Sequence, residues 1–206
     1  MPKPTKSPFI LLEDALPADK CEEIILSTHT STPNRDAKNN PTKTYKYNEL
    51  AEVRLMPMID NVLDGAEKHY GFETLKIHPF NFIWMAEGCK GDGFKMDNGH
   101  YYDGKWTQTK DIDFTILVFL STVQKSSITD SLMESFGGNL EFYNHRLTFS
   151  PKAGTMLMYP AGANFLNTFT TVELGNLHYI KIPITAKVPY VFKNENFPGN
   201  MNTWFN

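Results

Sequence analysis

The sequence predicts an α+β domain with a β-sandwich or barrel core. Two observations predict this class: two segments with helical periodicity come first, and about eight short apolar segments separated by turn residues follow them. A length of 206 residues fits one such domain, which can bury its core without disulfides. We expect the domain over residues 9–185, an N-terminal arm over residues 1–8 and a C-terminal extension over residues 186–206.

The helices are predicted within the first 70 residues, after a short apolar strand at Phe9–Leu12. The first helix begins after Asp14. Residues 28–44 are almost wholly polar and predict a long loop. The second helix is predicted over Asn48–Tyr70, where Pro57 is expected to kink or split it. Its expected apolar stripe consists of Leu50, Val53, Leu55, Met58, Ile59, Val62, Leu63 and Ala66.

Short apolar segments after Gly71 predict the strands. The most apolar of them, Asp113–Leu120, is typical of a strand that is central to a sheet. Further strands are expected at residues 75–85, Leu140–Phe142, Leu147–Phe149, Gly154–Tyr159 and His178–Ile184.

Charge and composition exclude several classes of function. A net charge of −3 and a pI near 6.1 argue against nucleic acid as a partner. The sequence has no apolar run approaching the roughly 20 residues of a membrane span, and its start has no signal-peptide pattern, so we expect a cytoplasmic protein. Two cysteines, Cys21 and Cys89, are too few for a disulfide framework or a four-thiolate zinc site.

Any metal chemistry must therefore use carboxylates and the six histidines of the chain. One of them, His145, lies in a predicted hairpin tip and is expected to be solvated. The histidines are His29, His69, His78, His100, His145 and His178.

Four segments, taken in order, carry a family resemblance. They are FILLEDALPADKCEEII, then MAEGCKGDGFKMDNG with the following KDIDFTILVFLS, then FGGNLEFYNHRLTFSPKAGTMLMYPAGANF, and finally GNLHYIKIPI. This set resembles the 2-oxoglutarate- and Fe(II)-dependent oxygenases, particularly the prolyl-hydroxylase-like branch of bacteria and phages. The resemblance implies a double-stranded β-helix (jelly-roll) core supported by the two N-terminal helices.

The resemblance also implies an iron site of two histidines and one carboxylate. Asp97 matches the carboxylate, but Lys95 stands at the first histidine position and Asn164 near the second. Lys181 matches the basic residue that pairs with the distal carboxylate of 2-oxoglutarate. An ammonium has no lone pair for a metal and an amide oxygen is a poor substitute for imidazole. We therefore expect no cofactor, and an ion pair between Lys95 and Asp97 where the metal would lie.

Three other residues could rescue a metal site. His100 and Asp103 are one residue too far apart for the His-x-Asp spacing, although a loop could accommodate them. His178 lies three residues before Lys181 and so faces the opposite side of a regular strand.

These observations favour a non-catalytic pseudoenzyme that acts through a protein partner or by self-assembly, located in the cytoplasm or, if phage-encoded, in the virion. One alternative is an active 2-oxoglutarate-dependent hydroxylase with an atypical Fe(II) site, and another is a sugar- or nucleotide-binding module. The aromatic residues of the extension either form an intermolecular arm or fold back over the domain; they are Tyr190, Phe192, Phe197, Trp204 and Phe205.

Overall fold

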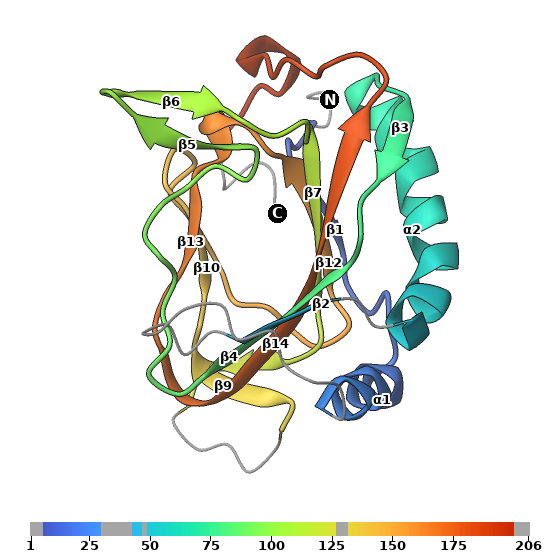
Figure 1. The fold of residues 1–206 in the computed structure, drawn as a ribbon, viewed down its shortest axis with the longest axis vertical. Helices are drawn as coiled ribbons and strands as arrows, with labels where there is room; N and C mark the ends of the chain where they lie inside the picture. Colours follow the sequence, from blue (N-terminus) through green and yellow to red (C-terminus); the bar gives the residue numbers. More distant parts are fainter. Residues whose placement is uncertain (1–5, 30–42, 47–48, 127–131, 200–206) are drawn as a thin grey trace, which may run out of the picture.

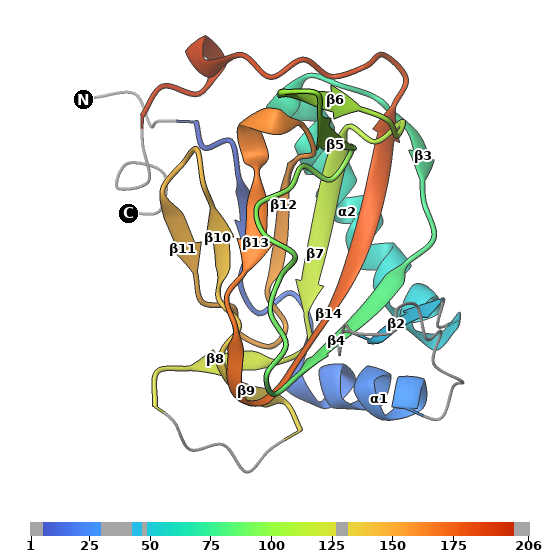
Figure 2. The ribbon, with the colours of Figure 1, turned by 60° about the vertical axis from the view of Figure 1, so that its left-hand side comes forward.

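The computed structural model describes residues 6–29, 43–46, 49–126 and 132–199, with only the backbone described for residues 43–46. Two helices cover one face of a strongly curled sheet, and a smaller sheet faces its other side (Figure 1, Figure 2). The predicted α+β class with a double-stranded β-helix core is confirmed.

The helices are α1 (Ala18–His29) and α2 (Glu49–Tyr70). Helix α2 continues through Pro57 without the expected split, because apolar residues on both sides of the proline pack onto the sheet and outweigh the loss of one amide donor. Val53, expected in the stripe, is exposed. The buried residues of α2 are Ala51, Leu55, Ile59, Val62, Leu63, Ala66 and Tyr70. Neither helix described in the structure combines the length and apolarity needed to cross a membrane.

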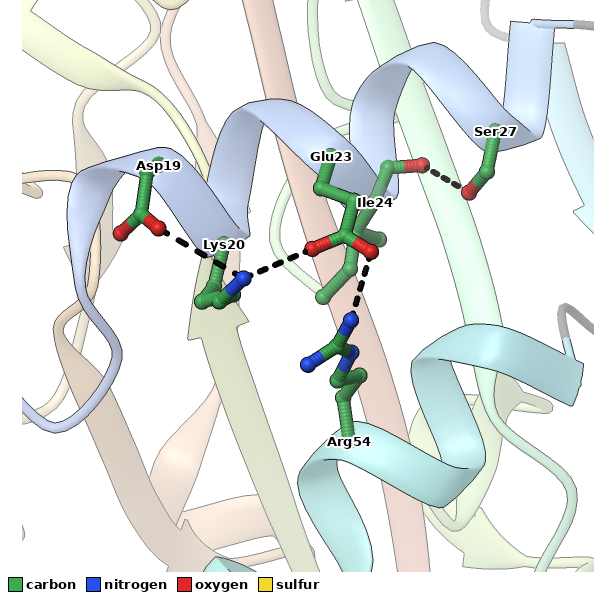
Figure 3. Close-up of polar contacts among 6 residues, drawn as sticks. All are labelled: Asp19, Lys20, Glu23, Ile24, Ser27 and Arg54. Atoms are coloured by element: carbon green, nitrogen blue, oxygen red, sulfur yellow. Dashed lines mark hydrogen bonds and ion pairs between the residues drawn. The ribbon is translucent and has the colours of Figure 1, made fainter.

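A charged contact joins the two helices on their exposed side. Glu23 of α1 accepts hydrogen bonds from Lys20, at 3.1 Å, and from Arg54 of α2, at 2.7 Å (Figure 3). These side chains are all at least one-third exposed, so the contact orients the helices and adds little stability.

The major sheet surrounds the long strand β14. Its strands are β1 (Ile10–Leu12), β2 (Lys43–Lys46), β3 (Thr74–Ile77), β4 (Asn81–Ala86), β7 (Phe114–Phe119), β8 (Thr122–Gln124), β9 (Glu134–Gly137), β12 (Met156–Pro160) and β14 (Val172–Ala186). The main strand order is β1-β12-β7-β14-β4-β2. Strands β3 and β9 also pair with β14, and β8 pairs with β9.

The smaller sheet and a separate hairpin complete the barrel. The smaller sheet has the order β11-β10-β13 and the hairpin pairs β5 with β6. The strands are β5 (Gly99–Tyr102), β6 (Lys105–Gln108), β10 (Leu140–Phe142), β11 (Leu147–Phe149) and β13 (Asn167–Phe169). The hairpin projects from one end of the barrel (Figure 1).

Alternation along the central strands separates two apolar cores. Ile116 and Val118 of β7 pack toward the helices, whereas Leu117 and Phe119 of the same strand pack toward the smaller sheet. Strand β7 lies inside the sheet, as the sequence predicted, and every one of its residues is buried. The core between the two sheets is the inside of the barrel, and the candidate site opens into it.

The described part of the C-terminal extension folds back over the domain. The buried carboxylate of Asp113 accepts 2.8 Å hydrogen bonds from the backbone amides of Ala186 and Tyr190. Phe192 packs edge-on against Phe165, and Phe197 is almost fully buried. These contacts agree with the folded-back arrangement for Tyr190, Phe192 and Phe197 (Figure 2), while Trp204 and Phe205 lie outside the described residues.

Candidate functional site

A cavity of about 200 Å³ lies between the two sheets. Its walls come from strands β4, β7, β12, β13 and β14 and from the segment 90–95. Polar groups from three of these elements meet in it: Tyr159 from β12, Asn167 from β13 and Lys181 from β14. Tyr179 and Lys181 of β14 both face this cavity because side chains two residues apart on a strand share a face.

Asp97 is bound by two of the residues that line the cavity, Tyr159 and Lys181, and only 1% of its side chain is exposed. A backbone hydrogen bond of 3.1 Å from its amide to the carbonyl of Ala161 holds it beside the end of β12. The Tyr159 hydroxyl donates a 2.8 Å hydrogen bond to one carboxylate oxygen, and the Lys181 ammonium forms a hydrogen-bonded ion pair with the other. Both carboxylate oxygens are thus engaged by groups of the chain itself.

The electrostatics of the site depend on this ion pair. Burial alone would raise the pKa of Asp97, but the nearby Lys181 ammonium and the hydroxyl of Tyr159 hold that pKa below its usual range. Burial and the Asp97 charge raise the pKa of the Tyr159 hydroxyl, and the same two causes raise the pKa of Tyr179. The site therefore consists of a carboxylate, an ammonium and two protonated phenols.

The expected ion pair between Lys95 and Asp97 is wrong. Lys95 is about half exposed and its ammonium pairs with Asp92 at 3.2 Å, at the rim of the cavity. The physical reason is that Lys181 reaches the buried carboxylate from the wall of the barrel, so Lys95 can keep its charge hydrated. Lys181, which the resemblance places at the position of the 2-oxoglutarate anchor, forms a hydrogen-bonded ion pair with Asp97.

The second predicted replacement, Asn164, does not reach the cavity. It is exposed in a short 3₁₀ turn, Ala163–Phe165, and lines a separate groove beside His145. Asn167 occupies the cavity instead and is buried. Its backbone exchanges two 3.0 Å hydrogen bonds with Lys95, so the two residues lie directly opposite each other. The structure thus pairs residues 95 and 167 at the cavity that also holds Tyr159 and Lys181, the partners of Asp97.

The three candidates for rescuing a metal site lie elsewhere. His100 and Asp103 are exposed, on the hairpin β5–β6 and in its turn. His178 is fully buried on the helix-facing side of β14, where its Nδ1 lies 3.1 Å from the Ser121 hydroxyl and its ring stacks on Trp84. The opposite orientations of His178 and Lys181 agree with the alternation expected for a regular strand.

His145 is not the solvated residue that its hairpin predicted. Its ring packs between Phe9 and Phe165, with centroid distances of 5.2 and 4.7 Å. Burial lowers the pKa of His145 to about 4. The imidazole is therefore neutral at pH 7 and belongs to the aromatic packing beneath the C-terminal extension.

These residues do not fit a divalent iron centre. The site has no imidazole. Lys95 pairs its ammonium with Asp92, and the Asp97 carboxylate is already bound by Lys181. Asn167 offers only a neutral amide. Within the described part of the chain, no three or more His, Cys, Asp or Glu side chains are grouped as metal ligands would be.

Sequence reasoning missed Tyr159 and Asn167. Alternation along the strand Gly154–Tyr159 was a signal for Tyr159, because it places this residue on the same face as Leu157, inside the barrel. Asn167 had no local signal, since its position follows from a long-range pairing with Lys95.

Comparison with known proteins supports the fold. No family model matches the sequence, and a search of curated proteins found no match. Among solved structures, the viral collagen prolyl hydroxylase of Paramecium bursaria Chlorella virus-1 in complex with 2-oxoglutarate superposes with a TM-score of 0.66 at 15% identity, covering 87% of this chain and 96% of that one.

Two further solved structures are similar over most of their length. A prolyl hydroxylase of Trichoplax adhaerens, in complex with a hypoxia inducible factor peptide, matches with a TM-score of 0.66 at 13% identity over 87% of this chain and 84% of that one. HygX of Streptomyces hygroscopicus, with nickel and 2-oxoglutarate bound, matches with a TM-score of 0.61 at 10% identity, covering 95% of this chain and 91% of that one. The chain therefore has the fold of the 2-oxoglutarate- and Fe(II)-dependent oxygenases.

Proposed function

We propose that this chain, built on the fold of the 2-oxoglutarate- and Fe(II)-dependent oxygenases, is a non-catalytic binding or structural protein that uses neither Fe(II) nor 2-oxoglutarate. One observation carries the proposal: both oxygens of the buried Asp97 carboxylate are bound by side chains of the same chain, Lys181 and Tyr159. A metal ion would have to displace the Lys181 ammonium from a site where that ammonium neutralises a buried charge.

The test is an anaerobic titration with Mn(II) in the presence of 2-oxoglutarate, followed by calorimetry. We expect no saturable binding with a dissociation constant below about 100 μM, which corresponds to roughly 5.5 kcal/mol of binding free energy. The Asp97→Asn variant is the matched control, because it removes the carboxylate and keeps nearly the same shape. Stoichiometric Mn(II) binding that disappears in this variant would refute the proposal.

The same titration tests the alternative, an active hydroxylase with an atypical iron site. Its support is that solved structures of this fold hold 2-oxoglutarate, in one of them together with nickel. This alternative requires a metal ligand besides Asp97. The candidates His100 and Asp103 are exposed, and His178 lies on the opposite face of β14. Binding of Mn(II) together with succinate production under air would establish it.

A partner protein or a second copy of the chain is the proposed binding partner, in the cytoplasm or, for a phage-encoded chain, in the virion. The support is the exposure of several aromatic side chains: Tyr101 and Tyr102, 60% and 68% exposed, lie on the hairpin, and Tyr143, 63% exposed, follows β10. Light scattering coupled to size exclusion tests self-assembly. A monomer at all concentrations would leave the partner protein as the proposal, and replacing Tyr101 and Tyr102 with serine should then weaken its capture.

A further inference from the structure

We propose that the Lys181 ammonium is a built-in replacement for a divalent cation, and that its removal would reopen a metal site at positions 95, 97 and 167. This inference concerns the same cavity and rests on the proposed function, namely that the unmodified chain holds no metal. It adds two claims: which residue substitutes for the ion, and which three positions would hold an ion.

The charge of Asp97 requires a cation. A carboxylate with 1% of its side chain exposed is strongly destabilising unless it is paired, because burial removes its hydration. In this cavity the ammonium of Lys181 supplies the positive charge, and the hydroxyl of Tyr159 supplies a further hydrogen bond. A divalent ion and the ammonium would compete for the same carboxylate, so one excludes the other.

Two further side chains, those of Lys95 and Asn167, line the cavity into which the partners of that carboxylate project. The reciprocal 3.0 Å hydrogen bonds between Lys95 and Asn167 make them a directly opposed antiparallel pair, whose side chains project to the same side. Asp97 follows Lys95 by two residues and lies in a turn, where it is held by Tyr159 and Lys181. Lys95 and Asn167 line the same cavity as these two partners of Asp97.

Neither Lys95 nor Asn167 is tightly held by its present contacts. The Lys95 ammonium makes a surface ion pair with Asp92, in which both side chains are more than half exposed. The Asn167 amide donates one 3.2 Å hydrogen bond, to the carbonyl of Phe165. Both side chains line the cavity, so a histidine at either position would extend into existing space, whereas Lys181 is held by the buried charge of Asp97.

The test compares Co(II) binding by four proteins, measured by calorimetry and by the visible ligand-field absorption of the bound ion. The first is the unmodified chain, and the second carries Lys95→His and Asn167→His. The third adds Lys181→Met to those two changes. The fourth is the matched control, Lys95→His, Asn164→His and Lys181→Met, in which the second histidine is placed in the exposed turn outside the cavity.

We expect only the third protein to bind Co(II) stoichiometrically. Its affinity should exceed that of the other three by at least about 10-fold, since even an outer partner of a metal ligand is worth 10–100-fold in affinity. The unmodified chain lacks both imidazoles at the site, the fourth protein lacks one of them, and in the second protein the Lys181 ammonium still occupies Asp97. Binding by the second protein as tight as by the third would overturn the claim that Lys181 blocks the ion. Equal binding by the third and fourth would overturn the assignment of position 167.

Failure of the inference is distinguishable from failure of the proposed function. Co(II) binding by the unmodified chain would refute the proposed function, and with it this inference. Absence of binding by both the unmodified chain and the folded third protein would refute only the inference.

Loss of folding in the third protein is covered by a second measurement. The double variant Asp97→Asn with Lys181→Met replaces the ion pair by neutral groups of similar shape and should melt at a higher temperature than Lys181→Met alone. A double variant that melts no higher than Lys181→Met alone would overturn the role of Lys181 as the counterion of Asp97.

Discussion

Replacement of Lys181 by methionine should destabilise the protein through the charge that it leaves behind. Methionine keeps the unbranched apolar stem of lysine and removes only the ammonium. Breaking a buried ion pair by removing one partner typically costs 3–5 kcal/mol. Lys181 is 24% exposed, so water can partly take over the ammonium's role, and we expect a loss of about 2–4 kcal/mol at pH 7. For a domain of this size the melting temperature should fall by roughly 4–16 °C.

The pH dependence of this loss identifies its cause. In the unmodified protein the pKa of Asp97 is lowered on folding, so the ion pair stabilises above the unfolded-state pKa of about 3.9, and this stability is lost as the pH falls through the folded-state pKa. In Lys181→Met, burial without a counterion should raise the pKa of Asp97 above its unfolded value. The variant then becomes relatively less destabilised on acidification, as Asp97 takes up a proton.

The assay is urea unfolding of both proteins between pH 7 and pH 4, with Lys95→Met as the matched control. Lys95 pairs with Asp92 at the exposed rim, so its replacement should change the unfolding free energy by less than about 0.5 kcal/mol. A Lys181→Met protein as stable as the Lys95→Met protein at pH 7 would refute the reasoning. So would a stability difference that does not shrink toward pH 4.

Three further predictions concern groups outside the cavity. Asp113→Asn should lower the unfolding free energy by about 1.5–3 kcal/mol in urea titrations, because it weakens the two charge-assisted hydrogen bonds that Asp113 accepts from the amides of Ala186 and Tyr190. An unchanged urea midpoint would contradict this role. The pKa of His145 is lowered to about 4 on folding, so the unfolding free energy should fall as the pH drops from about 6.5 to 4. His145→Gln should remove this part of the acid sensitivity of unfolding. Cys21 and Cys89 are fully buried, and burial raises the pKa of both thiols. A thiol reagent should therefore modify them only in denaturant, and rapid modification of the native protein would contradict their burial.

Local patterns in the sequence were sufficient for most of the fold. The helical stripe of residues 48–70 and the apolar run 113–120 predicted α2 and the central strand, because burial imposes a period of 3.6 or a continuous apolar run on such elements. The hairpin β5–β6 was not predicted, since its strands are mostly exposed and have no apolar alternation. The short strand β13 was also missed, because it is only three residues long.

For the candidate site, too, some features could be predicted from the sequence and others only from the tertiary structure. The sequence by itself determined that a carboxylate, Asp97, stands where the resemblance places a metal ligand, and that a lysine rather than a histidine precedes it by two residues. Only the tertiary structure decided that Lys181 neutralises Asp97 and that Asn167, not Asn164, faces Lys95. The physical reason is that these contacts join residues 84 and 72 positions apart, through strand pairing and burial that no local pattern encodes.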